Sequence, residues 1–441
     1  MSPLFRCLVM GAAGRDFHNL QTFFRRNPQF HVCAFTASQI PFISARAVPC
    51  ELAGPGYTED IPVFDEAMLP ELIARFQIDF VFLCYSDLSH TDVMHKASLV
   101  QASGASFVLL GPAQTQLVAR KPVISVTAVR TGAGKSPITQ FLARALQSDD
   151  RKVAVIRHPM PYGDLRLQRV QQFEVPHDLD RHECTIEERE EYEPYLEQGT
   201  PLFAGVDYER ILELAELETD VILWDGGNND FSFLKPNLSI VVADALRAGH
   251  EIGYFPGETN LRSADVIVIN KVDQARGEDI RQIRQNIAAV NPRAAIMEGT
   301  LEISVDHPER IPGKTALVVE DGPTLTHGGM SFGAGKLAAE KFGAAAILDP
   351  HPFAVGTLAD AFRLHPHIGP VLPALGYSDA QREELRETIA ACPADVLIDA
   401  SPARLDRVIP LQIPVARVSY RFVQRSGSPL EVLAEQMLSR L

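Results

Sequence analysis

Long apolar runs and paired cysteines are both missing from this sequence. No apolar stretch approaches the length of about 18 residues that a membrane-spanning helix needs, and the first residues lead directly into a strand rather than a secretion signal. The six cysteines are scattered, and none of them forms a Cys-x-x-Cys pair. The sequence therefore has no zinc or iron–sulfur signature, and we expect reduced thiols, a cytoplasmic location and no membrane contact.

Positive charge is also scarce. The 41 lysine and arginine residues are outnumbered by 56 aspartate and glutamate residues, which gives a formal net charge of −15. This balance argues against nucleic acid as a partner, and a site for a polyanionic metabolite needs a local cluster of arginine, lysine and histidine. The remaining composition, with 46% apolar residues over 441 positions, is typical of a globular protein of two or three domains.

The most specific motif lies at 123–136, VISVTAVRTGAGKS. A β-branched run is followed by a glycine-rich turn that ends in Gly-Lys-Ser, and then by apolar residues at helical spacing. Strand, glycine loop and helix N-terminus in this order predict the phosphate-binding loop, or P-loop, of nucleoside triphosphatases. Lys135 would reach the terminal phosphate and the Ser136 hydroxyl would bind Mg²⁺. The predicted nucleotide contacts in the loop are Gly132, Ala133, Gly134, Lys135, Ser136 and Pro137.

The loop departs from the standard pattern because Val129 replaces its first glycine. It resembles the deviant loop of dimerising P-loop NTPases, with Arg130 in the place of their signature lysine. Asp225 ends an apolar strand about ninety residues later, where a Walker B carboxylate holds Mg²⁺. His158 ends another strand, where it could contact a substrate phosphate. The predicted catalytic residues are Lys135, Asp225, Arg130 and His158.

Three blocks of alternating strands and helices follow one another along the chain. Val- and Ile-rich strands separated by helices predict parallel sheets with both faces covered. The fold class is therefore α/β, with three-layer parallel-sheet domains. We expect a Rossmann-like N-terminal domain at 1–120, a central P-loop NTPase domain at 121–300 and a C-terminal α/β domain at 301–441. The segment 296–330 could close either of the last two sheets.

Asn270-Lys271-Val272-Asp273 directly follows the strand VIVI. In GTP-binding proteins an Asn-Lys-x-Asp sequence binds guanine, whereas in related P-loop enzymes an asparagine at this point reads adenine. We predict that Asn270, Lys271 and Asp273 contact the base, and ATP and GTP both stay open.

Further charged groups suggest sites for anions. The segment 183–193 is strongly acidic, and such a run is usually a solvated helix face. In a sharper interpretation Thr185 caps a helix, Glu187 binds Mg²⁺ and Arg189 faces phosphate. Two glycine turns, at 11–16 and 324–336, carry cationic side chains of the kind that bind an anion. The predicted substrate-binding residues are Arg15, His18, Arg189, His327, Gly328, Gly329 and Lys336.

Taken together, these motifs resemble the cyclic 2,3-diphosphoglycerate synthetase family. The stretches that carry the resemblance are 10–19, 129–137, 157–165, 185–194, 224–230, 270–273 and 319–330, in consistent order along the chain. The resemblance implies a homodimer that uses Mg²⁺ and ATP to close 2,3-diphosphoglycerate, a small anionic phosphate metabolite, into its cyclic phosphoanhydride. ADP and phosphate would be released.

Two other classes of protein share parts of this pattern. A regulatory or metallochaperone GTPase would explain Asn-Lys-Val-Asp, but the chain lacks a Cys/His metal motif. A ParA/MinD-like positioning ATPase would need a membrane-seeking tail, and the last residues, 431–441, are short and acidic enough to form an ordinary packed helix. A phosphoryl-transfer enzyme is the favoured interpretation.

Overall fold

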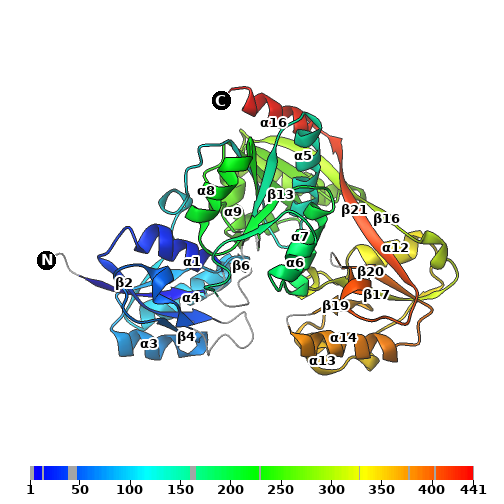
Figure 1. Cartoon of the computed structure of the whole chain (residues 1–441), viewed down its shortest axis with the longest axis horizontal. Coiled ribbons are helices and arrows are strands. Elements are labelled where there is room, and N and C mark those ends of the chain that lie inside the picture. Colours follow the sequence, from blue (N-terminus) through cyan, green and yellow to red (C-terminus); the bar gives the residue numbers. More distant parts are fainter. Residues whose placement is uncertain are drawn as a thin grey trace.

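The computed structural model of the protein describes residues 4–11, 14–37, 47–158, 165–227, 230–326, 328–375, 378–401 and 404–440, but not the side chains of Ile186, Glu187, Glu190 and Val408. The fold is mixed α/β with large, mainly parallel sheets, as predicted. Three groups of elements follow one another along the long axis of the molecule, with the N-terminal group at one end and most of the C-terminal group at the other (Figure 1). The limits of the three predicted domains stay a prediction.

The N-terminal group is a six-stranded sheet in the order β3-β4-β2-β1-β5-β7. Apart from the antiparallel β3–β4 contact its strands are parallel, and apolar side chains on β1 and β5 are buried between the flanking helices. Its elements are β1 (Phe5–Met10), α1 (Arg15–Asn19), β2 (Phe30–Ala37), β3 (Ala47–Val48), α2 (Cys50–Ala53), β4 (Ile61–Asp65), α3 (Leu69–Phe76), β5 (Phe80–Leu83), α4 (His90–Ala102) and β7 (Ser106–Val108).

The central group places the P-loop strand β8 between β12 and β13, in the order β10-β11-β9-β12-β8-β13-β15-β16. Every residue of β8, β9, β12 and β15 is buried, because helices cover both faces of this mainly parallel sheet, in which the β10–β11 pair is antiparallel. The strands are β8 (Val123–Ala128), β9 (Val153–Arg157), β10 (Gln171–Phe173), β11 (Leu202–Ala204), β12 (Val221–Asp225), β13 (Leu238–Asp244) and β15 (Val266–Asn270). The helices are α5 (Lys135–Ser148), α6 (His177–Arg181), α7 (Ile186–Leu196), α8 (Tyr208–Glu218), α9 (Gly257–Ser263) and α10 (Gly277–Val290).

Two long strands join the central and C-terminal groups into one continuous sheet. β16 (Ala295–Val305) is parallel to β15 and antiparallel to β21 (Val415–Ser426), and β21 continues in parallel with β20. The long pair β16–β21 is visible in Figure 1 between the two groups. The segment 296–330, which the sequence could assign to either of the last two sheets, begins with β16. This strand belongs to both sheets, because its eleven residues are long enough to reach from one to the other.

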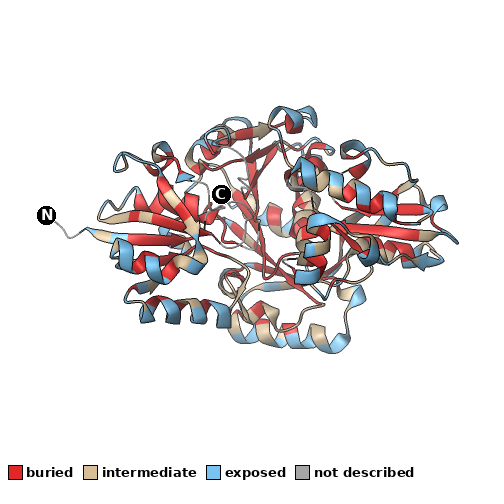
Figure 2. Ribbon diagram, turned by 90° about the horizontal axis from the view of Figure 1, so that it is seen from below, coloured by how far each residue is buried: buried red, intermediate tan, exposed pale blue. Residues whose placement is uncertain are grey.

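The C-terminal group surrounds β17, which pairs with β18, β19 and β20. Buried residues lie on the strands and exposed ones on the outer faces of the helices (Figure 2). Its elements are β17 (Thr315–Asp321), α11 (Gly322–Thr326), α12 (Ala334–Lys341), β18 (Ala346–Ile347), α13 (Gly356–Leu364), β19 (Leu372–Ala374), α14 (Asp379–Ala391), β20 (Val396–Ala400) and α15 (Leu405–Val408).

Two smaller contacts complete the architecture. β6 (Leu88–Ser89) and β14 (Tyr254–Phe255) form an antiparallel pair that links the N-terminal group to the central one. The last helix, α16 (Leu430–Leu438), packs against α5 of the central group, as expected for a terminal helix buried on one face. No helix in the described ranges has the length and apolar character needed to cross a bilayer.

Candidate active site

The loop between β8 and α5 has the conformation of a P-loop. Gly132 and Gly134 have φ angles of +76° and +100°, which side chains other than glycine rarely adopt. A Cβ atom on Gly134 would lie 2.3 Å from Nδ2 of Asn270, so the position is closed to larger residues by packing as well. Lys135 and Pro137 follow in the first turn of α5, and both are buried.

The Asn-Lys-Val-Asp motif holds this loop in place. Nδ2 of Asn270 donates to the carbonyl of Ala133 at 2.9 Å, and Nζ of Lys271 donates to the carbonyl of Gly132 at 2.7 Å. Asp273 instead accepts from Nη2 of Arg425, on β21, at 2.7 Å. Two of the three predicted base contacts are therefore joined to the phosphate loop and the third to an arginine. Contact with the base stays a prediction.

Asp225 lies at the end of β12, beside the P-loop, and is fully buried. Its Oδ2 accepts from the Tyr195 hydroxyl at 2.6 Å and from the guanidinium of Arg157. Arg157 also pairs with Glu191 and lies 3.2 Å from Oγ of Ser136. The guanidinium thus contacts Asp225 and Ser136, two of the three predicted Mg²⁺ ligands.

Sequence reasoning assigned no role to Arg157, although a signal was present. Arg157 is the last residue of β9 and Asp225 the last of β12, and the two strands pair so that these residues are opposite each other. The carboxyl ends of neighbouring parallel strands share one edge of the sheet, where ligands bind. An arginine immediately before the chosen His158 was therefore an equally good candidate.

The charges in this site are strongly coupled. Burial lowers the pKa of Lys135, and the carboxylates of Asp225 and Glu191 oppose that effect. Burial disfavours the charged form of Arg157 too, but the same two carboxylates outweigh it and raise its pKa. Burial, followed by the charge of Asp225, raises the pKa of Tyr195, so its phenol stays protonated and serves as a hydrogen-bond donor.

The site fits Mg²⁺ at one position. Oδ1 of Asp225 has no hydrogen-bond partner among the described residues although it is buried, and it belongs to the ligand type that Mg²⁺ prefers. Asp225 and Ser136 would hold the ion, which would neutralise charge on the nucleotide phosphates when bound. The side chain of Glu187, the third predicted ligand, lies outside the described residues.

The C-terminal group reaches over the P-loop. A Cβ atom on Gly132 would lie 3.2 Å from Cγ2 and Oγ1 of Thr324, in α11. The guanidinium of Arg247 joins the two parts, since it donates to the carbonyl of Thr131 and to that of Gly328, each at 2.6 Å. The carbonyl oxygen of Gly328 is therefore linked to the loop through Arg247.

The C-terminal group contributes a carboxylate, Asp321, to the site at the P-loop. The sequence pattern assigned no role to this residue. It ends β17 and accepts from the hydroxyl of Thr324. Burial, opposed by the hydrogen bond from Thr324, raises its pKa to about 6. Glu191 contributes to the rise and Lys135 opposes it, so these charges act on one another across the two groups.

The predicted N-terminal substrate residues are engaged in internal contacts. Arg15 lies 3.0 Å from Oδ1 of Asp230 and donates to the carbonyl of Tyr85 at 2.6 Å. The ring of His18 stacks on Phe233 at 4.1 Å. Burial lowers the pKa of His18 to about 3, so its ring is neutral at physiological pH. Neither residue presents a free positive charge to an anionic substrate.

Two predicted catalytic residues also lie on the side of the N-terminal group. His158 is 3.5 Å from Asp230, the partner of Arg15, and its ring lies where a Cβ on Gly14 would be. Arg130 donates to Asp87 at 2.6 Å and lies over the ring of Tyr254 at 3.7 Å. Arg130 thus connects the P-loop to the β6–β14 pair, while Lys135 and Asp225 lie at the site described above.

The remaining predicted anion contacts are paired with carboxylates. Nη2 of Arg189 is 2.5 Å from Asp180, and Nζ of Lys336 is 2.8 Å from Glu340. The N–H groups of residues 333, 335 and 336 donate to the buried Glu320 at 2.9–3.1 Å, so an internal carboxylate occupies this helix N-terminus. Binding of an external anion by this turn stays a prediction. His327 lies outside the described residues, and Gly329 has a φ of +66° in the same turn.

The acidic segment has a divided role. Thr185 caps α7 in a capping box with Glu188, as the sharper interpretation expected. Glu191 then points to Arg157 in the site, whereas Glu193 pairs with Arg407 of the C-terminal group at 2.8 Å. The segment is therefore an interface helix with one carboxylate at the P-loop, rather than a solvated face alone.

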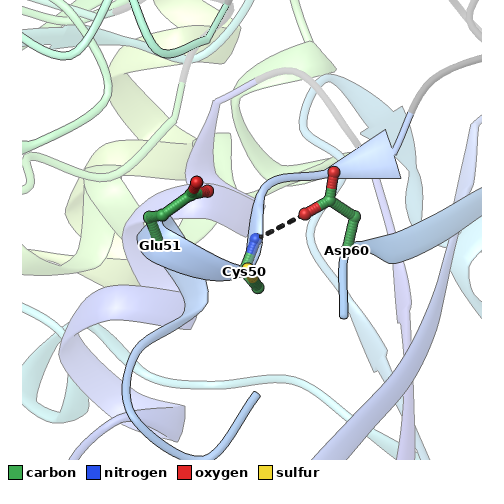
Figure 3. Close-up of side chains that lie close together, drawn as sticks. All are labelled: Cys50, Glu51 and Asp60. Atoms are coloured by element: carbon green, nitrogen blue, oxygen red, sulfur yellow. Dashed lines mark hydrogen bonds between the residues drawn. The ribbon is translucent and has the colours of Figure 1, made fainter. Parts of the chain in front are cut away.

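One group of potential metal ligands lies elsewhere, at the edge of the N-terminal sheet. Figure 3 shows Cys50, Glu51 and Asp60 close together, with the N–H of Cys50 donating to Asp60 at 3.0 Å. Arg166 lies 3.4 Å from Glu51 and 3.6 Å from Asp60 and balances their charge. We assign this group no catalytic role.

Comparison with known proteins identifies a close full-length relative. No protein-family model matches the chain. The arginine synthetase ArcE of Thermococcus kodakarensis is 55% identical over 432 residues, which are 98% of this chain and 96% of the relative.

Similarity to solved structures is much weaker. LpxK from Aquifex aeolicus in complex with ATP is 14% identical and covers 85% of this chain and 99% of its own, with a TM-score of 0.45. The hydrogenase maturation factor HypB from Archaeoglobus fulgidus is 16% identical, with coverages of 41% and 81% and a TM-score of 0.26. Scores this low support no functional argument, and none of the three named proteins is a cyclic 2,3-diphosphoglycerate synthetase. On the full-length identity, the chain belongs to the family of synthetases that includes arginine synthetase ArcE.

Proposed function

We propose that the protein is an ATP-dependent ligase that forms the guanidinium group of arginine from a ureido amino acid (citrulline) and ammonia. The name of its relative supports the product. The structural observation that carries the proposal is the charge of the site. The charges of Glu191 and Lys135 both act on Asp321, whereas Arg15, Arg189 and Lys336 are all paired with carboxylates. This arrangement suits a neutral or cationic acceptor better than a polyanion.

The chemistry follows from the acceptor. The ureido oxygen is a poor leaving group, so it must be activated before nitrogen can replace it. Attack of that oxygen on the γ-phosphorus of ATP forms an O–P bond, releases ADP and gives an O-phosphoisourea. Ammonia then adds to the isourea carbon, the C–O bond breaks, and phosphate leaves with the former ureido oxygen.

The residues beside the P-loop have complementary tasks in the first step. The ammonium of Lys135 and the guanidinium of Arg157 neutralise charge on the transferring phosphoryl group, which is the main form of catalysis in such reactions. Glu191 and Asp225 hold Arg157 at the edge of the sheet. Thr324 lies against Gly132, where it would restrict water at the loop, and this matters because an activated phosphate would otherwise be hydrolysed.

The motif resemblance supports a second proposal, ATP-dependent cyclisation of 2,3-diphosphoglycerate. Both reactions begin with transfer of the γ-phosphoryl group to an oxygen atom. A substrate with two phosphates and a carboxylate, however, needs several available cations. The paired state of Arg15, Arg189 and Lys336 makes this the weaker proposal.

Adenine is the proposed base. Asp273 would accept hydrogen bonds from guanine, but its carboxylate is bound to Arg425. Reading guanine would require this ion pair to break. ATP needs no such change.

One experiment separates these proposals. The purified protein is incubated with MgCl₂ and ATP, together with either citrulline and ammonium chloride or 2,3-diphosphoglycerate. Amino-acid analysis detects arginine, and phosphorus NMR detects ADP, phosphate and any cyclic phosphoanhydride. Arginine formed in step with ADP supports the ligase. A cyclic product, or the absence of arginine, would reject it.

A further inference from the structure

We propose that Asp321, on the C-terminal part of the chain, is the base that takes a proton from ammonium in the ligase reaction. This inference rests on the proposed function, and it adds a catalytic residue that the P-loop motifs do not contain. The C-terminal group would then complete the active site rather than only support the sheet.

The fold delivers this carboxylate to the loop. β17 ends at Asp321 and α11 begins at the next residue, so Thr324 lies one turn further on. Thr324 donates to Asp321 and at the same time lies against Gly132. Arg247 fixes the same turn through its bonds to the carbonyls of Thr131 and Gly328. Thr324 and Arg247 therefore hold the end of β17, with Asp321, beside the phosphate loop.

The neighbouring carboxylates are already bound to other groups. Glu191 is paired with the buried guanidinium of Arg157. Glu320, the residue before Asp321, accepts three backbone N–H groups at the start of α12. Asp321 accepts from the neutral hydroxyl of Thr324 and so keeps its negative charge available for a cation.

The groups facing Asp321 suit ammonium as its ligand. Glu191 on α7 adds negative charge near Asp321, and Lys135 on α5 offsets part of that charge. Glu320 directly precedes Asp321 on β17. An ammonium ion placed between Asp321 and the phosphorylated substrate would be attracted by the carboxylates. With a pKa of about 6, Asp321 is ionised at neutral pH and is less acidic than an ordinary carboxyl group.

The proton balance of the step is complete. Ammonium transfers one proton to Asp321 and becomes ammonia, whose lone pair forms the new C–N bond. The C–O bond breaks, and a proton from the attacking nitrogen leaves with phosphate. Asp321 then releases its proton to solvent, which accounts for the single proton produced in each turnover.

The test compares two nucleophiles in two variants. Hydroxylamine is largely uncharged at neutral pH, so it attacks without first losing a proton. With ammonium chloride, Asp321→Asn should form arginine about 10²- to 10⁴-fold more slowly than the unaltered protein. With hydroxylamine it should form N-hydroxyarginine within a few-fold of the unaltered rate. Glu320→Gln, which changes the adjacent buried carboxyl, should keep both rates within a few-fold.

The outcomes are distinct. If the unaltered protein makes no arginine, the proposed function fails. If it does and Asp321→Asn retains the ammonium rate, or loses both rates equally with ATP binding intact, the base assignment is wrong. Should Asp321→Asn fail to fold, Asp321→Glu keeps the carboxylate and should shift the acid limb of the pH profile for kcat at saturating ammonium. An unmoved limb would also overturn the assignment.

Discussion

Replacing Arg157 by methionine tests whether the Arg157 guanidinium and Mg²⁺ share one position between Asp225 and Ser136. Arg157 is buried, and its removal leaves the fully buried Asp225 and the partly buried Glu191 without their common partner. Breaking a buried ion pair in this way costs about 3–5 kcal/mol, because one charge remains uncompensated. Methionine fills much of the same volume, so the change is chiefly electrostatic.

The magnitude can be expressed as a melting temperature. An unfolding entropy of about 2.1 cal/mol/K per residue gives about 0.9 kcal/mol/K for 441 residues, and Tm should fall by about 3–5 °C. Added MgCl₂ should restore part of this loss in the variant, since the ion can bind Asp225 where the guanidinium was. Added MgCl₂ should raise the Tm of the unaltered protein less than that of the variant, because Arg157 already occupies that position.

Differential scanning calorimetry with and without MgCl₂ measures both effects. Arg210→Met is the control, since Arg210 and Glu213 form an exposed pair on α8, and such pairs contribute about 0–1 kcal/mol. A Tm for Arg157→Met within about 1 °C of the unaltered protein would refute the calculated cost. An equal Mg²⁺ response in the two proteins would refute the shared position.

Three further predictions concern turnover, the base and pH. Lys135→Ala should lower ATP turnover by at least about 10²-fold with folding retained, as measured by steady-state kinetics and circular dichroism. Arg425→Ala frees Asp273, so competition binding should show a gain in GTP affinity relative to ATP; no change would mean that Asp273 does not reach the base. Burial raises the pKa of Glu320 to about 7, above its ordinary 4.5, so its stabilising effect is full below pH 4.5 and lost as pH rises through 7. Chemical unfolding between these values should show a flatter stability profile for Glu320→Gln than for the unaltered protein.

The elements with strong local patterns were predictable from the sequence. The P-loop was predicted because Gly132 and Gly134 need left-handed φ angles and Lys135 follows at the start of an apolar helix. The α/β class followed from Val- and Ile-rich strands, and the helix cap at Thr185 from its place at the start of the acidic run. In each case neighbours in the chain supply the physical constraint.

Tertiary structure decided which charges are free to act. From the sequence, Arg15 and Arg189 were equivalent to any exposed cation, and the fold brings Asp230 and Asp180 to them, whereas Lys336 pairs with Glu340 one turn further along α12. Likewise Asp321 lies 186 positions after Lys135, with no motif to connect them. The β16–β21 pair joins β17, which ends at Asp321, to the sheet that contains the P-loop strand β8, and burial then makes the charges of Asp321 and Lys135 interact over that sequence distance. Local sequence determined the phosphate loop, whereas long-range packing determined what faces it.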